Sequence, residues 1–118
     1  MEKNPYMVGL KMVRENIGTS GQIALAKCIL SLYNSDHAFS ISEIVSPLDF
    51  KYTGIVVAML SAYIKKGETE ELRIAGKWVY DHFPHLVELS NAMTEARGSV
   101  RLKWDRHHEE KRGLYQDA

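Results

Sequence analysis

The amino-acid sequence predicts a mainly α protein, a compact helical domain with a helix-turn-helix-like core. First, a residue able to cap a helix (Asn, Thr, Ser or Asp) precedes each apolar segment of the first half of the chain. Second, the apolar residues in most of these segments recur every three or four positions. Third, a turn at residues 46–49 joins a short segment to a long one, the spacing of a helix-turn-helix. We expect one domain over residues 1–96, followed by a basic, partly ordered extension over residues 97–118.

Local signals predict the first two helices. Asn4 and Pro5 open the first, because asparagine is a favoured N-cap and proline lacks only an N–H that the first turn leaves unpaired. The apolar stripe of this helix is Tyr6, Leu10, Val13 and Ile17. Thr19 caps the second helix with Gln22 in the capping-box position, and the nearly continuous apolar run over residues 23–33 predicts a helix buried on most sides.

The next two helices form the predicted helix-turn-helix. Ser40 and Glu43 make a second capping box, which opens a short helix that Pro47 prevents from continuing. Asp49 caps the long helix that follows, and Gly67 ends it. Its apolar set is Phe50, Val56, Val57, Leu60, Tyr63 and Ile64. We expect the apolar faces of three consecutive helical segments before Gly67 to pack against one another, which leaves recognition to the periphery of the domain.

Residues 68–83 have two interpretations. Thr69 followed by two glutamates resembles a helix start, and four apolar residues keep a helical spacing: Leu72, Ala75, Val79 and Phe83. The same segment also resembles two strands, and the succession Trp78, Val79 and Tyr80 favours β-structure. We favour the second interpretation, a small β-hairpin that would form the wing of a winged helix. A further short helix is expected over residues 85–96, stopped at Gly98.

Composition limits the classes of function. Fifteen basic and fifteen acidic residues cancel, so the chain has no long-range attraction to nucleic acid or to an anionic membrane. The charges are uneven, however: residues 68–96 hold two basic and six acidic groups, whereas residues 97–112 hold six basic and three acidic groups. The single cysteine, Cys28, fits a reducing compartment, and no apolar run is long enough for a signal peptide or a membrane span. We therefore expect a cytoplasmic protein with no membrane partner.

Catalysis and metal binding have no positive support in the sequence. Neither of the histidine pairs, His82 with His85 and His107 with His108, has the i,i+4 spacing that would put both rings on one face of a helix, and no zinc motif is met. Cys28 lies in a nearly all-apolar helix, where a thiol is expected to be an inert core residue. We expect no enzyme, no cofactor and no metal, and the histidines alone keep a small metal-dependent enzyme open as a third class.

Two kinds of binding function are carried forward. Aromatic residues are enriched at protein interfaces, so the candidate protein-binding residues are Trp78, Tyr80 and Trp104. The alternative is a small winged-helix DNA-binding transcriptional regulator. For that function Lys51, Tyr52 and Thr53 would contact DNA from the start of the recognition helix, and Arg101, Lys103 and Arg106 would contact phosphates. A helix-turn-helix regulator would be dimeric, so a homodimer is among the expected assemblies.

The patterns GTSGQ-IALAKCILSLYN and AFSISEIVSPLD resemble an uncharacterised family of small helical bacterial proteins that are often plasmid- or prophage-borne. The match covers about residues 18–49, with a looser similarity over residues 76–89. The resemblance implies a small helical fold and a mobile-element setting, and it brings no activity or catalytic residue to carry over. The leading hypothesis is a non-enzymatic accessory protein that binds a protein partner, for example an inhibitor of a host defence complex.

Overall fold

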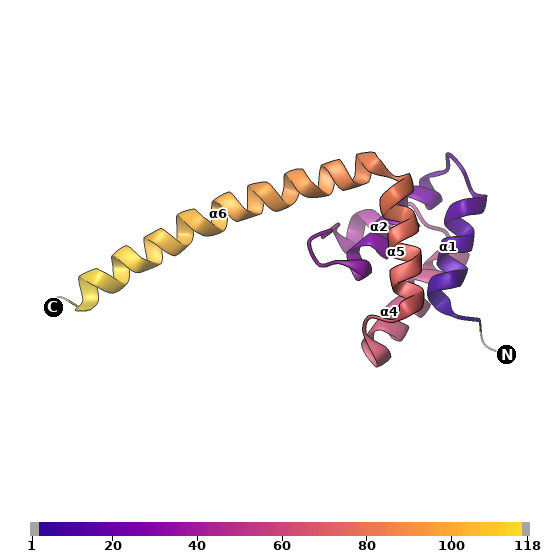
Figure 1. The fold of residues 1–118 in the computed structure, drawn as a ribbon, viewed down its shortest axis with the longest axis horizontal. Coiled ribbons are helices and arrows are strands. Elements are labelled where there is room, and N and C mark those ends of the chain that lie inside the picture. Colours follow the sequence, from indigo (N-terminus) through magenta and orange to yellow (C-terminus); the bar gives the residue numbers. More distant parts are fainter. Residues whose placement is uncertain (1–2, 117–118) are drawn as a thin grey trace.

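A computed structural model describes residues 3–116, and within that range the chain forms six α-helices and no strand (Figure 1). The mainly α prediction is therefore confirmed. The helices are α1 (Pro5–Glu15), α2 (Ser20–Tyr33), α3 (Ile41–Val45), α4 (Phe50–Lys66), α5 (Glu70–His82) and α6 (Pro84–Gln116). The first five helices and the start of α6 form a compact body, from which the rest of α6 projects, so the longest dimension of the molecule is 65 Å and the other two are 30 and 25 Å.

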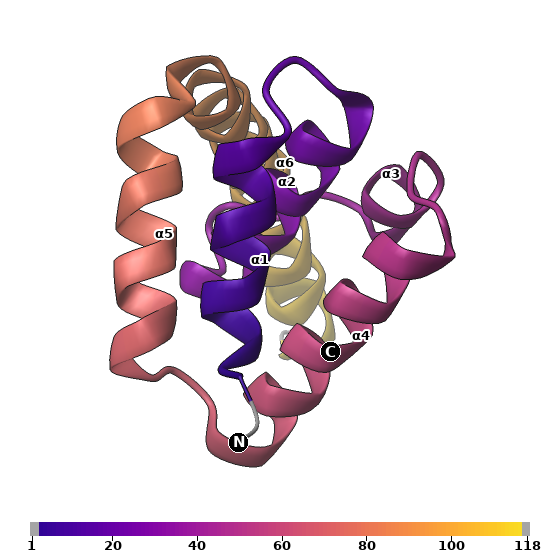
Figure 2. The same ribbon diagram turned by 90° about the vertical axis from the view of Figure 1, so that its right-hand side faces the viewer.

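The second helix is the centre of the body. It contacts α1, α3, α4 and α5, and α1 lies between α5 and α4 on one side of it (Figure 2). Its buried residues surround the helix, and several are completely buried: Leu25, Ala26, Ile29 and Leu30. The prediction of a helix buried on most sides is confirmed. The core therefore consists of the apolar stripes of the neighbouring helices packed around α2.

The predicted helix starts are confirmed by their hydrogen bonds. The Asn4 side chain accepts from the backbone N–H of Tyr6 at 3.0 Å, and the Asp49 carboxylate accepts from Tyr52 N–H at 2.9 Å. At the start of α3 the capping box is complete: Ser40 N–H donates to the Glu43 carboxylate at 2.7 Å, and Glu43 N–H donates to the Ser40 hydroxyl at 3.1 Å. Each bond satisfies an N–H that the first turn of a helix leaves without an intrahelical partner.

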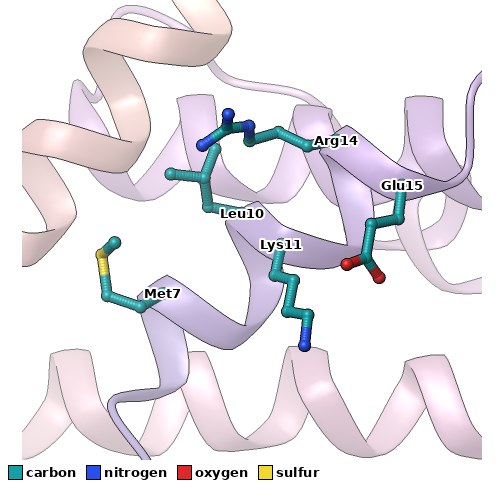
Figure 3. A pocket seen from close by; sticks show the side chains of 5 residues that line it. All are labelled: Met7, Leu10, Lys11, Arg14 and Glu15. Atoms are coloured by element: carbon teal, nitrogen blue, oxygen red, sulfur yellow. The ribbon is translucent and has the colours of Figure 1, made fainter.

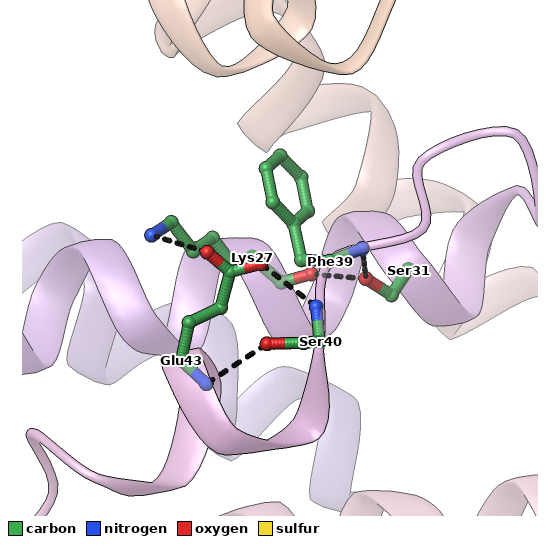
Figure 4. A network of polar contacts seen from close by, with 5 residues as sticks. All are labelled: Lys27, Ser31, Phe39, Ser40 and Glu43. Carbon is green, nitrogen blue, oxygen red and sulfur yellow. Dashed lines mark hydrogen bonds and ion pairs between the residues drawn. The ribbon is translucent and has the colours of Figure 1, made fainter. Parts of the chain in front are cut away.

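Polar contacts also hold α3 against α2 (Figure 4). The ammonium group of Lys27 lies 3.5 Å from the second carboxylate oxygen of Glu43, so Glu43 serves the capping box and an interhelical ion pair together. The hydroxyl of Ser31 donates to the Lys27 carbonyl and accepts from the backbone N–H of Phe39. These contacts fix the segment that leads from α2 into α3, and with it the position of α4.

The junction between α1 and α2 differs from the prediction in two details. Because α1 ends at Glu15, Ile17 falls outside the helix and is 82% exposed instead of joining the buried stripe. Thr19 caps α2 as predicted, but the Gln22 side chain accepts from the N–H of Gly18 rather than that of Thr19. Its amide also donates to the Val13 carbonyl at 2.7 Å, so this buried glutamine ties the end of α1 to the start of α2.

The preferred hairpin interpretation of residues 68–83 is wrong, because this segment contains the helix α5. The Thr69 side chain caps it by accepting from Leu72 N–H, and one face of the helix is buried, with Leu72, Ala75, Gly76 and Val79. The helix forms because its buried face packs against α1 and α2. This packing stabilises the helical spacing of these residues more than the β-propensity of residues 78–80 favours a strand. No wing exists among residues 3–116.

The predicted helix stop at Gly98 is also wrong. Helix α6 begins at Pro84, directly after the Phe83 cap of α5, and continues through Gly98 to Gln116. A glycine inside a helix lowers its stability but does not break it. The predicted extension over residues 97–118 therefore continues the helix that starts on the body, as far as the structure describes it; residues 117 and 118 lie outside the described range.

Gly76 gives a direct test of the packing of α5 on α2. A Cβ atom at this position would overlap the Cβ and ring atoms of Tyr33, and a rotation of the ring would not move its Cβ. We expect Gly76→Ala to lower the free energy of unfolding by about 1–3 kcal/mol, as overpacking does. The control is Gly54→Ala, where no atom lies within 4 Å of the added Cβ and the better helix propensity of alanine contributes up to ~1 kcal/mol.

Both variants are measured by urea unfolding followed by circular dichroism. If Gly76→Ala is as stable as Gly54→Ala, helices α5 and α2 do not approach each other as described.

Candidate functional site

The most exposed apolar stripe of the body lies on α4. Phe50 is 97% exposed, Val57 55% and Ile64 84%. These residues are seven positions apart, and Gly54 and Ser61 fall between them at helical spacing, so the five side-chain positions form one line along the helix. We call this line the α4 face. The expectation that the apolar faces of the helices before Gly67 pack against one another is wrong for this helix, because only Val56 and Met59 of α4 are buried.

The reason for this exposure is that α4 is apolar on two sides. Val56 and Met59 point toward the body, and Met59 packs closely against Gly9 of α1. Phe50, Val57 and Ile64 lie on the opposite side, where no described helix covers them. Burying an apolar side chain stabilises by roughly 1.5–3 kcal/mol, so leaving three of them in water is a feature that calls for a partner.

A groove runs along the C-terminal half of α4, between this helix and the start of α1. It encloses about 470 Å³ and is lined by Lys3, Asn4, Pro5, Ala58, Ser61, Ala62, Lys65 and Lys66. The groove is open because the α4 side chains that line it, Ala58, Ser61 and Ala62, are small. The lysines that line it are Lys3, Lys65 and Lys66. Asp49 places a carboxylate at the start of α4, whereas Lys65 and Lys66 lie at its end, so the positive charge of this side of the body is concentrated at the C-terminal end of the apolar stripe.

The three aromatic residues predicted to bind protein do not share one surface. Trp78 is half-buried: its ring stacks on His82 with the centroids 3.9 Å apart, and the Arg14 guanidinium lies 5.5 Å from its centroid. Tyr80 is 44% exposed on another side of α5, with its ring 5.8 Å from that of His37. Trp104 is 50% exposed and lies on the projecting part of α6.

The residues predicted to bind nucleic acid fall into two separate groups. Lys51 is exposed at the start of α4, whereas Tyr52 and Thr53 are half-buried, and Tyr52 packs near Gly21 of α2. The cations of the second group, Arg101, Lys103 and Arg106, are exposed on α6. Helix α6 starts at the far end of α5 from the C-terminus of α4 and then leads away from the body (Figure 1).

A histidine and a serine form a buried pair that the sequence did not indicate, because they are 53 residues apart. His37 Nδ1 lies 2.7 Å from Ser90 Oγ, and their exposed fractions are 6% and 1%. The donor in this bond is set by the histidine tautomer, because Ser90 Oγ also lies 3.2 Å from the Asp36 carbonyl and can donate to either partner. The pair connects the loop before α3 to the start of α6.

Other candidate groups do not converge on a site. Cys28 is buried, and this burial raises the pKa of its thiol to about 12, which fits the prediction of an inert core cysteine. A hollow of about 410 Å³ lies on α1, but Leu10 and Arg14 point to one side of the helix while Lys11 and Glu15 point to the other (Figure 3). Among the residues described, no three His, Cys, Asp or Glu side chains are placed to hold one metal ion.

Comparisons with known proteins add no relative. No family model matches the chain, and neither a curated protein nor a solved structure matches it significantly. The resemblance over residues 18–49 therefore stays a prediction. Across residues 3–116, no helix has both the length and the apolar character needed to span a bilayer.

The buried His37 makes stability depend on pH. Desolvation lowers the pKa of His37, and the nearby Asp36 carboxylate opposes this effect without reversing it. Because the unfolded chain then binds a proton more readily than the folded one, stability is fully present above the ordinary histidine pKa of about 6.5 and falls as the pH drops toward the folded value. We expect unfolding in urea to need less denaturant at pH 5 than at pH 7.

The matched variant is His37→Asn, which keeps a side-chain N–H donor but does not titrate. Its stability should be lower at pH 7 and should decrease less than that of the unmodified chain between pH 7 and pH 5. An equal decrease in both proteins would assign the pH dependence to other groups.

Proposed function

We propose that this chain is a non-enzymatic accessory protein that acts by binding a protein partner, and that the α4 face is its main contact surface. The observation that carries the proposal is the line of Phe50, Val57 and Ile64, exposed on the outside of the body. Large apolar side chains aligned on one helix are the anchors by which helices bind apolar surfaces of other proteins.

The charges of this surface indicate the chemistry of the partner. Lys65 and Lys66 lie near the C-terminal end of the α4 face without a carboxylate on that turn, whereas at the other end Lys51 has the Asp49 cap beside it. Charged rims of opposite sign favour association and fix its direction. The partner therefore has an apolar strip flanked by Asp or Glu, as an acidic amphipathic helix has.

The resemblance over residues 18–49 supports a setting for this function. Proteins carried by plasmids and prophages commonly meet the complexes of a host cell, and a host defence complex with an acidic, apolar helix is one partner of the stated kind. The α4 face would then act by covering that helix. This setting rests on the resemblance, whereas the binding surface rests on the exposure of the side chains.

The test removes the two most exposed anchors together, as Phe50→Ser with Ile64→Ser. Because both side chains lie in water, the circular dichroism spectrum and the urea midpoint should stay unchanged. Binding to the partner should weaken more than a hundredfold, since each buried side chain contributes ~1.5–3 kcal/mol. The control is Ile17→Ser, which removes an 82% exposed apolar side chain outside the α4 face.

The measurement is affinity capture from the native cell, followed by titration of the captured protein. The unmodified chain and Ile17→Ser should retain the same acidic protein, and the double variant should lose it. Equal capture by all three proteins would place the binding surface elsewhere on the molecule, and capture by none of them would remove the proposal.

DNA binding is the second candidate, and one observation favours it. Helix α6 exposes six cations between positions 97 and 112: Arg97, Arg101, Lys103, Arg106, Lys111 and Arg112. Against it, the predicted recognition helix exposes an apolar line, and of its three predicted DNA contacts only Lys51 is fully exposed. We expect no measurable binding of random duplex at 150 mM salt. Tight binding that falls steeply between 50 and 200 mM salt, and that Arg101→Gln with Arg106→Gln weakens, would favour DNA instead.

A further inference from the structure

The second half of α6 has no support from the body. The last hydrogen bonds between this helix and the body, within the residues described, come from Thr94 to the Asp36 carbonyl at 2.9 Å and from Arg97 to the Ala38 carbonyl at 3.2 Å. From Gly98 onward the helix projects away from the other elements (Figure 1). An isolated helix of this length is marginal in water, and two glycines, Gly98 and Gly113, weaken it further. A covering partner would give this segment the stability that it lacks alone.

An apolar stripe runs along residues 89–107 of this helix. Its members are Leu89, Met93, Ala96, Val100, Trp104 and His107, and of these Met93 also packs partly against the core of the body. They are separated by three or four positions and span 18 residues, which is five helical turns, so they form one straight line. Leu89 is 47% exposed, Val100 55% and Trp104 50%. Ala96 and Val100, with Arg97 and Arg101, also line a shallow hollow of about 340 Å³. We call this line the α6 stripe.

The charges on α6 are divided between its two halves. Residues 84–96 contain two carboxylates, Glu88 and Glu95, and no lysine or arginine. Residues 97–112 contain six cations and three carboxylates, a net charge of +3. The two halves of the helix therefore have net charges of opposite sign. Because the helix is continuous, its basic half cannot contact its own acidic half.

We propose that two copies of this chain associate through their α6 helices, which pack antiparallel along the α6 stripe. An antiparallel pair sets the basic half of each helix beside the acidic half of the other, and it also opposes the two helix dipoles. A parallel pair would place like charges together. The pairing places the Trp104 half of one helix against the Leu89 half of the other. The projecting half of α6 in each copy would then pack on the half of α6 that contacts the body of the other copy.

This inference goes beyond the proposed function, since it concerns a different helix and a different partner. The two surfaces can be tested separately, because the α4 face and the α6 stripe share no residue. A chain that dimerises through α6 keeps the α4 face free for a protein partner.

The test measures the mass of the full chain by sedimentation equilibrium over a range of concentrations. We expect a dimer that the substitution Val100→Lys weakens at least tenfold, because it places a charge in the centre of the α6 stripe. The control is Leu102→Lys, which adds the same charge to the same helix at a side chain of matching exposure, 54% against 55%, but on the opposite side of the helix. Its dissociation constant should change less than threefold.

Salt distinguishes the two directions of pairing. In the antiparallel pair the charges attract, so the dimer should weaken between 50 and 500 mM salt, whereas a parallel pair would strengthen. Since Val100 lies outside the body, the urea midpoint of its variant should match that of the unmodified monomer. A monomer at all concentrations would overturn the proposal. A dimer that survives Val100→Lys but dissociates in the Phe50→Ser, Ile64→Ser variant would overturn it too, by assigning self-association to the α4 face.

Discussion

The burial of α2 is the constraint on which the rest of the body depends. The side chains of α2 are buried around the circumference of the helix. Each neighbouring helix therefore buries its own apolar stripe by packing against α2. Two helices approach each other closely only where the residues at their contact are small. At the contact of α5 with α2, Gly76 leaves room for the side chain of Tyr33. Since one α4 stripe is already packed in the body, its second stripe has no described neighbour left to cover it. The exposed line on α4 is thus a consequence of how the core is built.

The features that could be predicted from the sequence are those decided within one turn of a helix. Asn4, Ser40 and Asp49 cap their helices as expected, because a capping side chain needs only an N–H two or three residues ahead. The all-round burial of α2 was also predictable, since a helix without a polar face has no side to present to water. These local rules gave the start of each of the first four helices.

Features decided by distant residues could not be predicted in the same way. The β-propensity of Trp78 and Tyr80 favoured a hairpin, but α1 and α2 reward the helical spacing of Leu72 and Val79. Phe50, Val57 and Ile64 were recognised as apolar, yet periodicity cannot say which of two apolar stripes on one helix faces the core. The buried pair of His37 and Ser90 leaves no local signal at all, because the chain between them contains three helices.

The continuity of α6 determines what its charge division can do. If the helix broke at Gly98, residues 99–116 could fold back, and the basic half would pair with the acidic half of the same molecule. The unbroken helix prevents this, so the complementary halves can meet only in two molecules. In the proposed dimer, pairing between copies would replace the contacts of a helical hairpin, which is the relation found in domain-swapped dimers. Gly98 lies at the point where the body contacts end, so it would serve as the hinge in a folded-back form, and in the straight helix it lowers the stability by about 0.5–1 kcal/mol relative to alanine. The projecting helix is, in this view, half of a two-helix unit that a second chain completes.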